Sequence, residues 1–130
     1  MATDYLLDTC TALWWMAGSD NIPPDVTAEL ADPAGRVLLS DVSVLEMVIK
    51  FRLGKLGFKK KPSVLLPNLA KRHGFERLRL GTRAIFQLES MPMHHRDPFD
   101  RLLVAQAIVH RLVLVSPDAK LRKYKAPILW

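Results

Sequence analysis

The sequence has few of the features that define several large classes of protein. Its single cysteine, Cys10, cannot form an internal disulfide, which is consistent with a reducing compartment and excludes a cysteine-rich zinc site. No apolar run reaches the roughly 18 residues that a membrane-spanning helix needs. The N-terminus carries Asp4 instead of the basic residues of a signal peptide, and no repeat or low-complexity segment occurs. We therefore expect a cytoplasmic protein with no membrane association.

The composition is that of one ordinary globular domain, which we expect to span residues 1–130. Hydrophobic residues make up 49% of the chain, enough for one core. The net charge of +6 is unevenly distributed, because residues 1–46 carry eight acids and one base, whereas residues 47–130 carry eighteen bases and five acids. A basic surface with an acidic site suits a polyanion bound through its phosphates, although a solvated basic face without a partner has the same charge pattern.

Short apolar runs alternate with helical patterns along the whole chain. We expect buried strands at 5–7, 37–40 and 112–115, a last strand at 127–130, and either an edge strand or an extended connection at 75–80. This alternation is typical of an α/β protein with a mainly parallel central sheet flanked by helices. The expected helices lie at about 12–17, 23–31, 43–54, 63–73, 82–89, 97–111 and 119–124.

Five acidic residues fall at passages from a strand or loop into a helix. Each of them, taken alone, is explained by helix capping, because a carboxylate accepts from the free amides of a helix N-terminus and is stabilised by the helix dipole. Ser43 and Glu46 have the spacing of a capping box, and Asp97 before Pro98 is typical of an N-cap before a first-turn proline. The five acids are Asp8, Glu46, Asp97, Asp100 and Asp118.

In a parallel sheet such passages share one edge, so we expect the five carboxylates to meet in one cleft. Two carboxylates about 4 Å apart repel by on the order of 4 kcal/mol at an effective dielectric of about 20, and helix dipoles offset only about 0.3–1 kcal/mol each. A divalent cation would offset the repulsion, and carboxylate oxygens with open water positions suit Mg²⁺ or Mn²⁺ rather than zinc. His94 and His95 are either additional ligands or residues at the surface or behind the ligands.

Four segments of the chain resemble PIN-domain ribonucleases, in particular the VapC-like toxins of bacterial toxin–antitoxin pairs. They occur in the same order as in that family and extend over nearly the whole chain. The most distinctive is His-His-Arg-Asp-Pro-Phe-Asp-Arg-Leu-Leu, which begins at residue 94. The segments are Tyr5 to Thr9, Ser43 to Leu56, His94 to Ala107 and Tyr124 to Trp130.

The resemblance implies a single PIN-like domain and a Mg²⁺- or Mn²⁺-dependent endoribonuclease, in which a water activated by the ion attacks an RNA phosphodiester. It also implies a homodimer and an antitoxin protein that blocks the site. It assigns catalysis and metal binding to Asp8, Glu46, Asp100 and Asp118, and makes Asp97 a flanking acid.

Five further residues are candidates for supporting roles around these acids. Thr9, Ser43 and Ser116 carry hydroxyls that either orient carboxylates or cap helices. Arg96 and Arg101 either contact substrate phosphate and the neighbouring acids or form surface salt bridges.

The chain departs from the family's pattern at two positions. Cys10 stands where close relatives usually have histidine. Ser116 stands where threonine usually precedes the last acid by two residues; it keeps the hydroxyl, while Pro117 stiffens the approach to Asp118.

Two other functions are consistent with the same residues. In a basic RNA-binding or protein-interaction module the acids would be helix caps and nothing more. In an aspartyl-phosphate phosphatase Asp8 would be the nucleophile, but such sites usually have a second aspartate two residues later, where this chain has Cys10.

Overall fold

The computed structural model describes residues 2–130, and within them the chain forms a five-stranded sheet in the order β3-β2-β1-β4-β5. All four neighbouring pairs are parallel, which confirms the expected α/β class. The segment 75–80 contributes an edge strand. The strands are β1 (Tyr5–Leu7), β2 (Val37–Ser40), β3 (Glu76–Leu78), β4 (Val113–Val115) and β5 (Ile128–Leu129).

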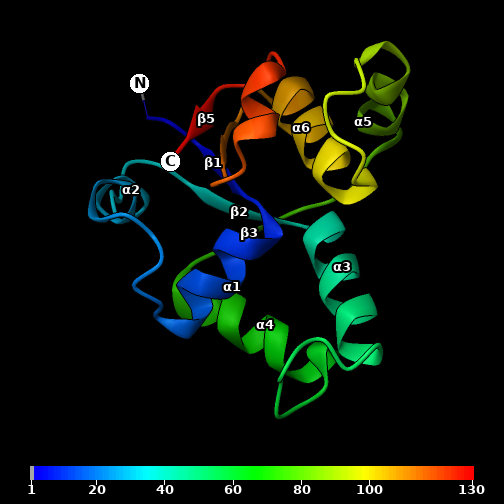
Figure 1. The fold of residues 1–130 in the computed structure, drawn as a ribbon. Coiled ribbons are helices and arrows are strands. Elements are labelled where there is room, and N and C mark those ends of the chain that lie inside the picture. The colour runs from blue at the N-terminus through cyan, green and yellow to red at the C-terminus, as the bar shows by residue number, and fades with distance from the viewer. Residues whose placement is uncertain (1) are drawn as a thin grey trace.

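Helices cover both faces of this sheet, with α5 and α6 above the strands and α1 and α4 below them in Figure 1. Across residues 2–130, no helix combines the length and the apolar character needed to cross a bilayer. The helices are α1 (Thr9–Ala17), α2 (Pro24–Leu30), α3 (Asp41–Arg52), α4 (Pro62–His73), α5 (Thr82–Gln87), α6 (Pro98–His110) and the short 3-10 turns η1 (Leu88–Ser90) and η2 (Ala119–Lys123).

The strands divide the apolar side chains between two cores, because successive residues of a strand point to opposite faces. Leu6 packs with α5, α6 and η2, while Leu7 packs with α1, α2 and α4. Both leucines have no exposed surface. The sheet is therefore covered on both faces, which leaves the carboxyl ends of its strands as the edge where polar side chains gather.

The start of α3 differs from the capping-box prediction. Ser40, at the end of β2, has an extended backbone and accepts from the Val42 amide at 2.9 Å, so the N-cap lies three residues earlier than expected. Ser43 therefore lies inside the helix, and Glu46 lies too far from its first turn to reach the free amides. The interpretation of Ser43 and Glu46 as a capping box is wrong, and Glu46 needs another explanation.

Candidate active site

A pocket of about 360 Å³ lies at the carboxyl ends of β1 and β4, beside the N-termini of α1 and α6. It collects side chains that are far apart in the sequence, as the parallel sheet predicts. Of the described residues that line it, only Lys50 is basic. The acidic residues of its lining are Asp8, Glu46, Asp97, Asp100 and Asp118.

Asp8 is held in place by the start of α1. Its carboxylate accepts from the Thr11 amide at 2.7 Å, so the aspartate caps the helix, and its residue surface is only 5% exposed. Burial raises the pKa of Asp8; hydrogen bonds from Ser116 and Thr11 oppose this effect, and the negative charge of Glu46 adds to it. Capping therefore accounts for the position of Asp8 but leaves its charge poorly compensated.

Asp100 is the most strongly perturbed carboxyl group of the pocket. It lies in the first turn of α6, where Asp97 is the N-cap and accepts from the amides of Phe99 and Asp100. Burial and then the negative charges of Asp97 and Asp8 raise the pKa of Asp100 to about 7, against an opposing effect of His95. The protein thus concentrates more negative charge here than its own groups neutralise.

Glu46 projects from the second turn of α3 and pairs with Lys50 one turn later, at 2.7 Å between Oε2 and Nζ. Its other oxygen, Oε1, is buried and has no hydrogen-bond partner among the described residues. The hydrogen bond to Glu46 raises the pKa of Lys50, and burial opposes that effect. Lys50 was not among the predicted site residues, although its i,i+4 spacing from Glu46 indicates such a pair.

Asp118 lies at the start of η2 and is reached by His95 from the loop before α6. The His95 Nε2 atom is 2.7 Å from Oδ2 of Asp118 and 3.4 Å from Oδ2 of Asp100. Burial alone would raise the pKa of Asp118, but hydrogen bonds from the Lys120 amide and His95 bring it below its usual value. One nitrogen or oxygen of each of His95, Asp100 and Asp118 lies within 4.8 Å of the others.

The three candidate hydroxyls occupy different settings. Ser116 is fully buried; its side-chain oxygen accepts from the Asp118 amide at 3.1 Å, and its hydroxyl lowers the pKa of Asp8. The Thr9 hydroxyl donates to the Ser43 hydroxyl at 3.0 Å instead of to a carboxylate. Thr9, which lines the pocket, therefore joins α1 to Ser43 of α3, whereas Ser116 holds the backbone of Asp118.

The two candidate arginines are absent from the described lining of the pocket. Arg96 is exposed on the loop before α6. Arg101 points back along that loop and donates from Nη2 to the Met91 carbonyl at 3.3 Å. Arg101 therefore supports the loop, and Arg96 is free to meet a ligand from solvent.

Cys10 lines the mouth of the pocket, and its residue surface is exposed. Burial and then the negative charge of Asp8 raise the pKa of the Cys10 thiol to about 11. A thiol with a raised pKa is a weak nucleophile near neutral pH.

These features fit a divalent cation in the pocket. The buried Oε1 of Glu46 has no hydrogen-bond partner among the described residues, and the raised pKa values of Asp8 and Asp100 indicate negative charge that the neighbouring side chains do not fully compensate. The available oxygens match the preference of hard cations such as Mg²⁺.

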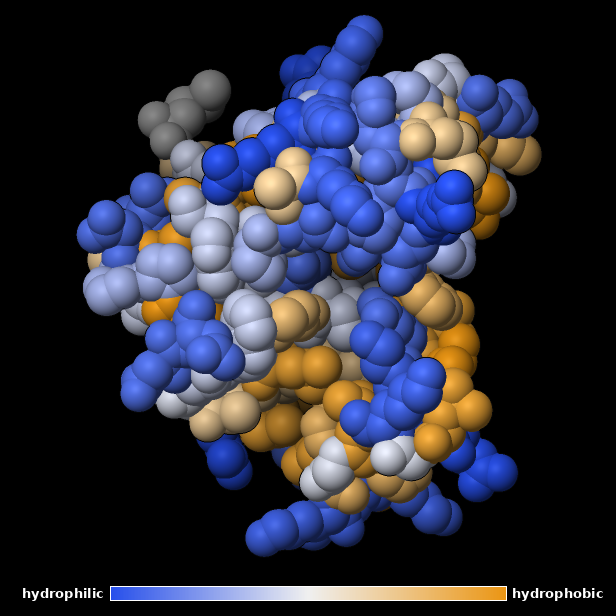
Figure 2. All heavy atoms as spheres, viewed as in Figure 1, coloured by the Kyte–Doolittle hydropathy of each residue, from blue (hydrophilic) through white to orange (hydrophobic). Residues whose placement is uncertain are grey.

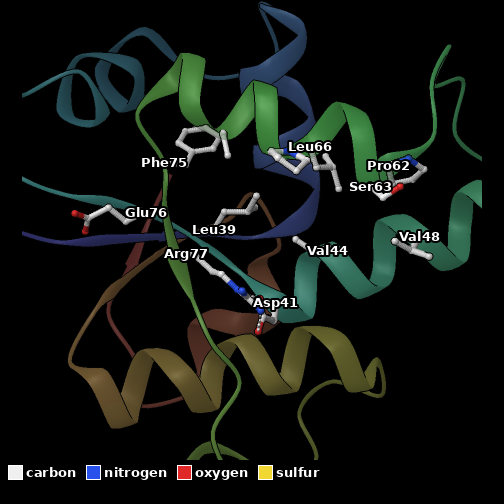
Figure 3. Close-up of a pocket in the computed structure, with 12 residues that line it drawn as sticks. Leu39, Asp41, Val44, Val48, Pro62, Ser63, Leu66, Phe75, Glu76 and Arg77 are labelled. Carbon is white, nitrogen blue, oxygen red and sulfur yellow. Dashed lines mark hydrogen bonds and ion pairs between the residues drawn. The ribbon is translucent and has the colours of Figure 1, made fainter.

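A second cavity is apolar and lies apart from the acids. Figure 2 shows apolar side chains gathered over α3 and α4, and Figure 3 shows a groove between these helices beside β3. The groove has a volume of about 480 Å³, with Val48 and Leu66 on its walls and an Arg77–Asp41 ion pair of 2.7 Å at one end. The sequence analysis did not predict it, because the two walls come from segments separated by a basic loop.

Comparisons with known proteins agree with this architecture. A model of the PIN domain matches residues 5–127. No curated protein sequence matches the chain significantly.

Among solved structures, VapBC2 from Rickettsia felis, bound to a promoter DNA fragment, superposes with a TM-score of 0.72 at 15% identity, over 98% of this chain and 99% of that one. DNA-bound VapBC from Salmonella typhimurium gives 0.69 at 17% identity, covering 99% and 98% of the two chains. FitAcB from Neisseria gonorrhoeae gives 0.65 at 19% identity, covering 97% and 96%. At such identities the likeness shows a shared fold. Because the family model spans nearly the whole sequence, the chain belongs to the PIN-domain family.

Proposed function

We propose that this PIN-domain protein is a metal-dependent endoribonuclease that acts in the cytoplasm as the toxin of a toxin–antitoxin pair. PIN domains are generally nucleases, and the similar structures from Rickettsia felis and Salmonella typhimurium are VapBC assemblies. The observation that carries the proposal is the convergence of Asp8, Glu46 and Asp100 on one pocket, where Lys50 is the only base among the described lining residues.

The proposed metal site consists of Asp8, Glu46 and Asp100, with Asp118 at its edge. These residues would hold Mg²⁺ or Mn²⁺, and the ion would supply Lewis-acid activation of water and stabilisation of negative charge on the phosphoryl oxygens. The chain's own residues prepare the site: the Thr11 amide orients the Asp8 carboxylate, Ser116 holds the backbone of Asp118, and Thr9 and Ser43 fix α1 against α3.

The proposed substrate is held by positive charge outside the acids. Lys50 faces the pocket, and its ammonium is placed to meet a phosphate beside the bound ion. Arg96 is exposed on the adjoining loop, and the basic excess of residues 47–130 provides a wider surface for an RNA backbone.

The proposed protein partners would use the apolar surfaces. A homodimer would cover large side chains that α3 and α5 leave exposed, and Leu53, just beyond α3, and Phe86, on α5, are 63% and 64% exposed. The groove between α3 and α4 offers an apolar site for a segment of the antitoxin.

A module whose acids only cap helices is a weaker explanation. Asp8, Asp97 and Asp118 do cap helices, but Glu46 does not, and its buried Oε1 has no partner among the described residues. A capping role also leaves no reason for placing Asp100 where its pKa rises to about 7.

RNA cleavage by purified, antitoxin-free protein, with Mn²⁺ and with EDTA, tests the proposal. Asp8→Asn is the informative variant, because asparagine still accepts from the Thr11 amide and caps α1 while removing the charge. We expect cleavage by the wild type that EDTA and Asp8→Asn abolish. Intact RNA with folded wild type would contradict the proposal. Hydrolysis of small phosphate esters without RNA cleavage would favour a phosphatase, and DNA of the same sequence tests the preference for RNA.

A further inference from the structure

His95 occupies a position in the acidic site that the proposed chemistry does not yet use. Its side chain is only 13% exposed and lies between the carboxylates of Asp118 and Asp100. Tyr124 fixes the loop that carries His95, because the backbone amides of His94 and His95 both donate to the Tyr124 hydroxyl, at 3.1 and 3.0 Å. The ring is therefore held in one place by groups outside the pocket.

The backbone also determines which ring nitrogen carries the proton. The Asp97 amide donates to Nδ1 of His95 at 3.0 Å, and an amide N–H can only donate. Nδ1 therefore presents its lone pair, and the proton of the neutral ring lies on Nε2.

An Nε2 proton has two carboxylate acceptors within reach. Oδ2 of Asp118 lies at 2.7 Å and Oδ2 of Asp100 at 3.4 Å, so the first is a short hydrogen bond and the second a weaker shared contact. Both nitrogens are then occupied, one by the amide and the other by its own proton. No lone pair remains for a cation, although the distances among His95, Asp100 and Asp118 would allow one.

We propose that His95 is a positioning residue, which donates from Nε2 to Asp118 and Asp100 and holds both carboxylates for the divalent cation without ligating it. The inference rests on the proposed function, because it assigns a purpose to the carboxylates. Of the two carboxylates, Asp118 depends more on such a partner. Its side chain is 33% exposed, so fewer neighbouring groups restrict its orientation.

The proton position can be read directly by NMR. A long-range ¹H–¹⁵N correlation spectrum of the wild-type protein at pH 7.5 is expected to show His95 as the Nε2–H tautomer, both without Mg²⁺ and with saturating Mg²⁺. An Nδ1–H tautomer, or loss of the Nε2 proton when Mg²⁺ is added, would overturn the assignment. This readout requires no variant and no enzymatic activity.

Two substitutions separate positioning from ligation. His95→Gln keeps an amide N–H near the place of Nε2, so Mn²⁺ affinity measured by calorimetry is expected to stay within about threefold of the wild type. His95→Ala removes the donor, and the affinity is expected to fall about 10- to 100-fold. Equal affinities of His95→Ala and the wild type would overturn the proposal.

His94→Ala is the matched control. The His94 ring packs edge-on against Tyr124 at 5.0 Å between centroids, and its backbone donor survives the substitution. Its Mn²⁺ affinity is expected to match the wild type, and the unfolding temperatures of all three variants in EDTA verify the fold. If the wild type binds Mn²⁺ with this order of affinities but leaves RNA intact, the nuclease proposal fails and the role of His95 stands.

Discussion

The chain places its aspartates in two contrasting settings. Asp4 and Asp41 lie outside the pocket and pair with Arg36 and Arg77, and the hydrogen bonds from these arginines hold both pKa values below their usual range. In the pocket, burial and the negative charges of Asp97 and Asp8 raise the pKa of Asp100 to about 7. The chain has nineteen basic residues, enough to pair the acids of the pocket with lysine or arginine as well. Keeping the arginines away from the pocket preserves its negative charge, which is typical of a functional site.

The largest expected effect comes from removing charge inside the pocket. Asp100→Asn takes away a proposed metal ligand, and we expect Mn²⁺-dependent RNA cleavage to fall at least about 1,000-fold, more than loss of a supporting hydrogen bond costs. Asp41→Asn is the matched control, since it removes a carboxylate of the paired kind and is expected to leave the cleavage rate unchanged. Comparable rates for Asp100→Asn and the wild type would remove Asp100 from the site.

Sequence patterns predicted the parts of the structure that depend on local chemistry. Asp97 before Pro98 identified the start of α6, and the alternation of apolar runs and helical patterns identified the parallel sheet. The start of α3 was missed, because Ser40 and Ser43 are equally good caps by residue type. Only the end of β2 decides between them, and that depends on the pairing of β2 with its neighbouring strands.

The acidic residues of the site could be predicted from the sequence, but the basic residue that partly neutralises them could not. The sheet topology brings strand ends together, so the five acids could be expected in one pocket. Which base accompanies them depends on side-chain direction: Lys50 points into the pocket, while Arg101 turns to the Met91 carbonyl. Adjacent residues in the sequence, such as His94 and His95, likewise point to different partners.

The stability of the metal-free protein provides the second test. The pKa of Asp100 is raised in the folded state, so between pH 4 and pH 7 the folded protein binds more protons than the unfolded chain and its stability falls as pH rises. Asp100→Asn removes this loss. Because Asp100 is partly exposed and water screens its charge, we expect the substitution to stabilise the metal-free protein at pH 8 by only about 2–3 kcal/mol and to have little effect at pH 4. Urea unfolding in EDTA at both pH values measures the difference. Equal effects at both pH values would show that Asp100 is not perturbed.

Added cation should relieve the same repulsion. At pH 8, Mg²⁺ at a hundredfold excess over its dissociation constant is expected to stabilise the folded protein by about 2.7 kcal/mol. At pH 5.5 Asp100 holds its proton and competes with the ion, so the same Mg²⁺ concentration is expected to raise the unfolding temperature less. Thermal unfolding at the two pH values tests this. A rise that is larger at pH 5.5 would show that the ion binds elsewhere.

A smaller effect on metal affinity is expected from substitution of Lys50, the one basic residue among the described residues that line the pocket. Its ammonium neutralises Glu46 before an ion arrives, so Lys50→Met is expected to raise Mn²⁺ affinity about tenfold, or about 1.4 kcal/mol. Lys50→Arg keeps the charge and serves as the control with wild-type affinity. Weaker Mn²⁺ binding by Lys50→Met would mean that the ammonium supports the bound state instead of competing with it.

The smallest expected effect is on stability, from substitution of an aspartate that is paired with arginine, and it is opposite in sign to the effect of Asp100→Asn. Asp41 has a lowered pKa, so its pair with Arg77 stabilises the fold above the unfolded pKa near 3.8 and is lost as pH falls through the folded value. Arg77 is 66% exposed, and water and salt screen the pair. Asp41→Asn should therefore lower the unfolding temperature at pH 8 by only about 1–3 °C, and less in 1 M salt. The same substitution at Asp100 raises it. If both variants shifted stability in the same direction at pH 8, the two settings would not differ in charge compensation, and the argument for a cation in the pocket would lose its electrostatic basis.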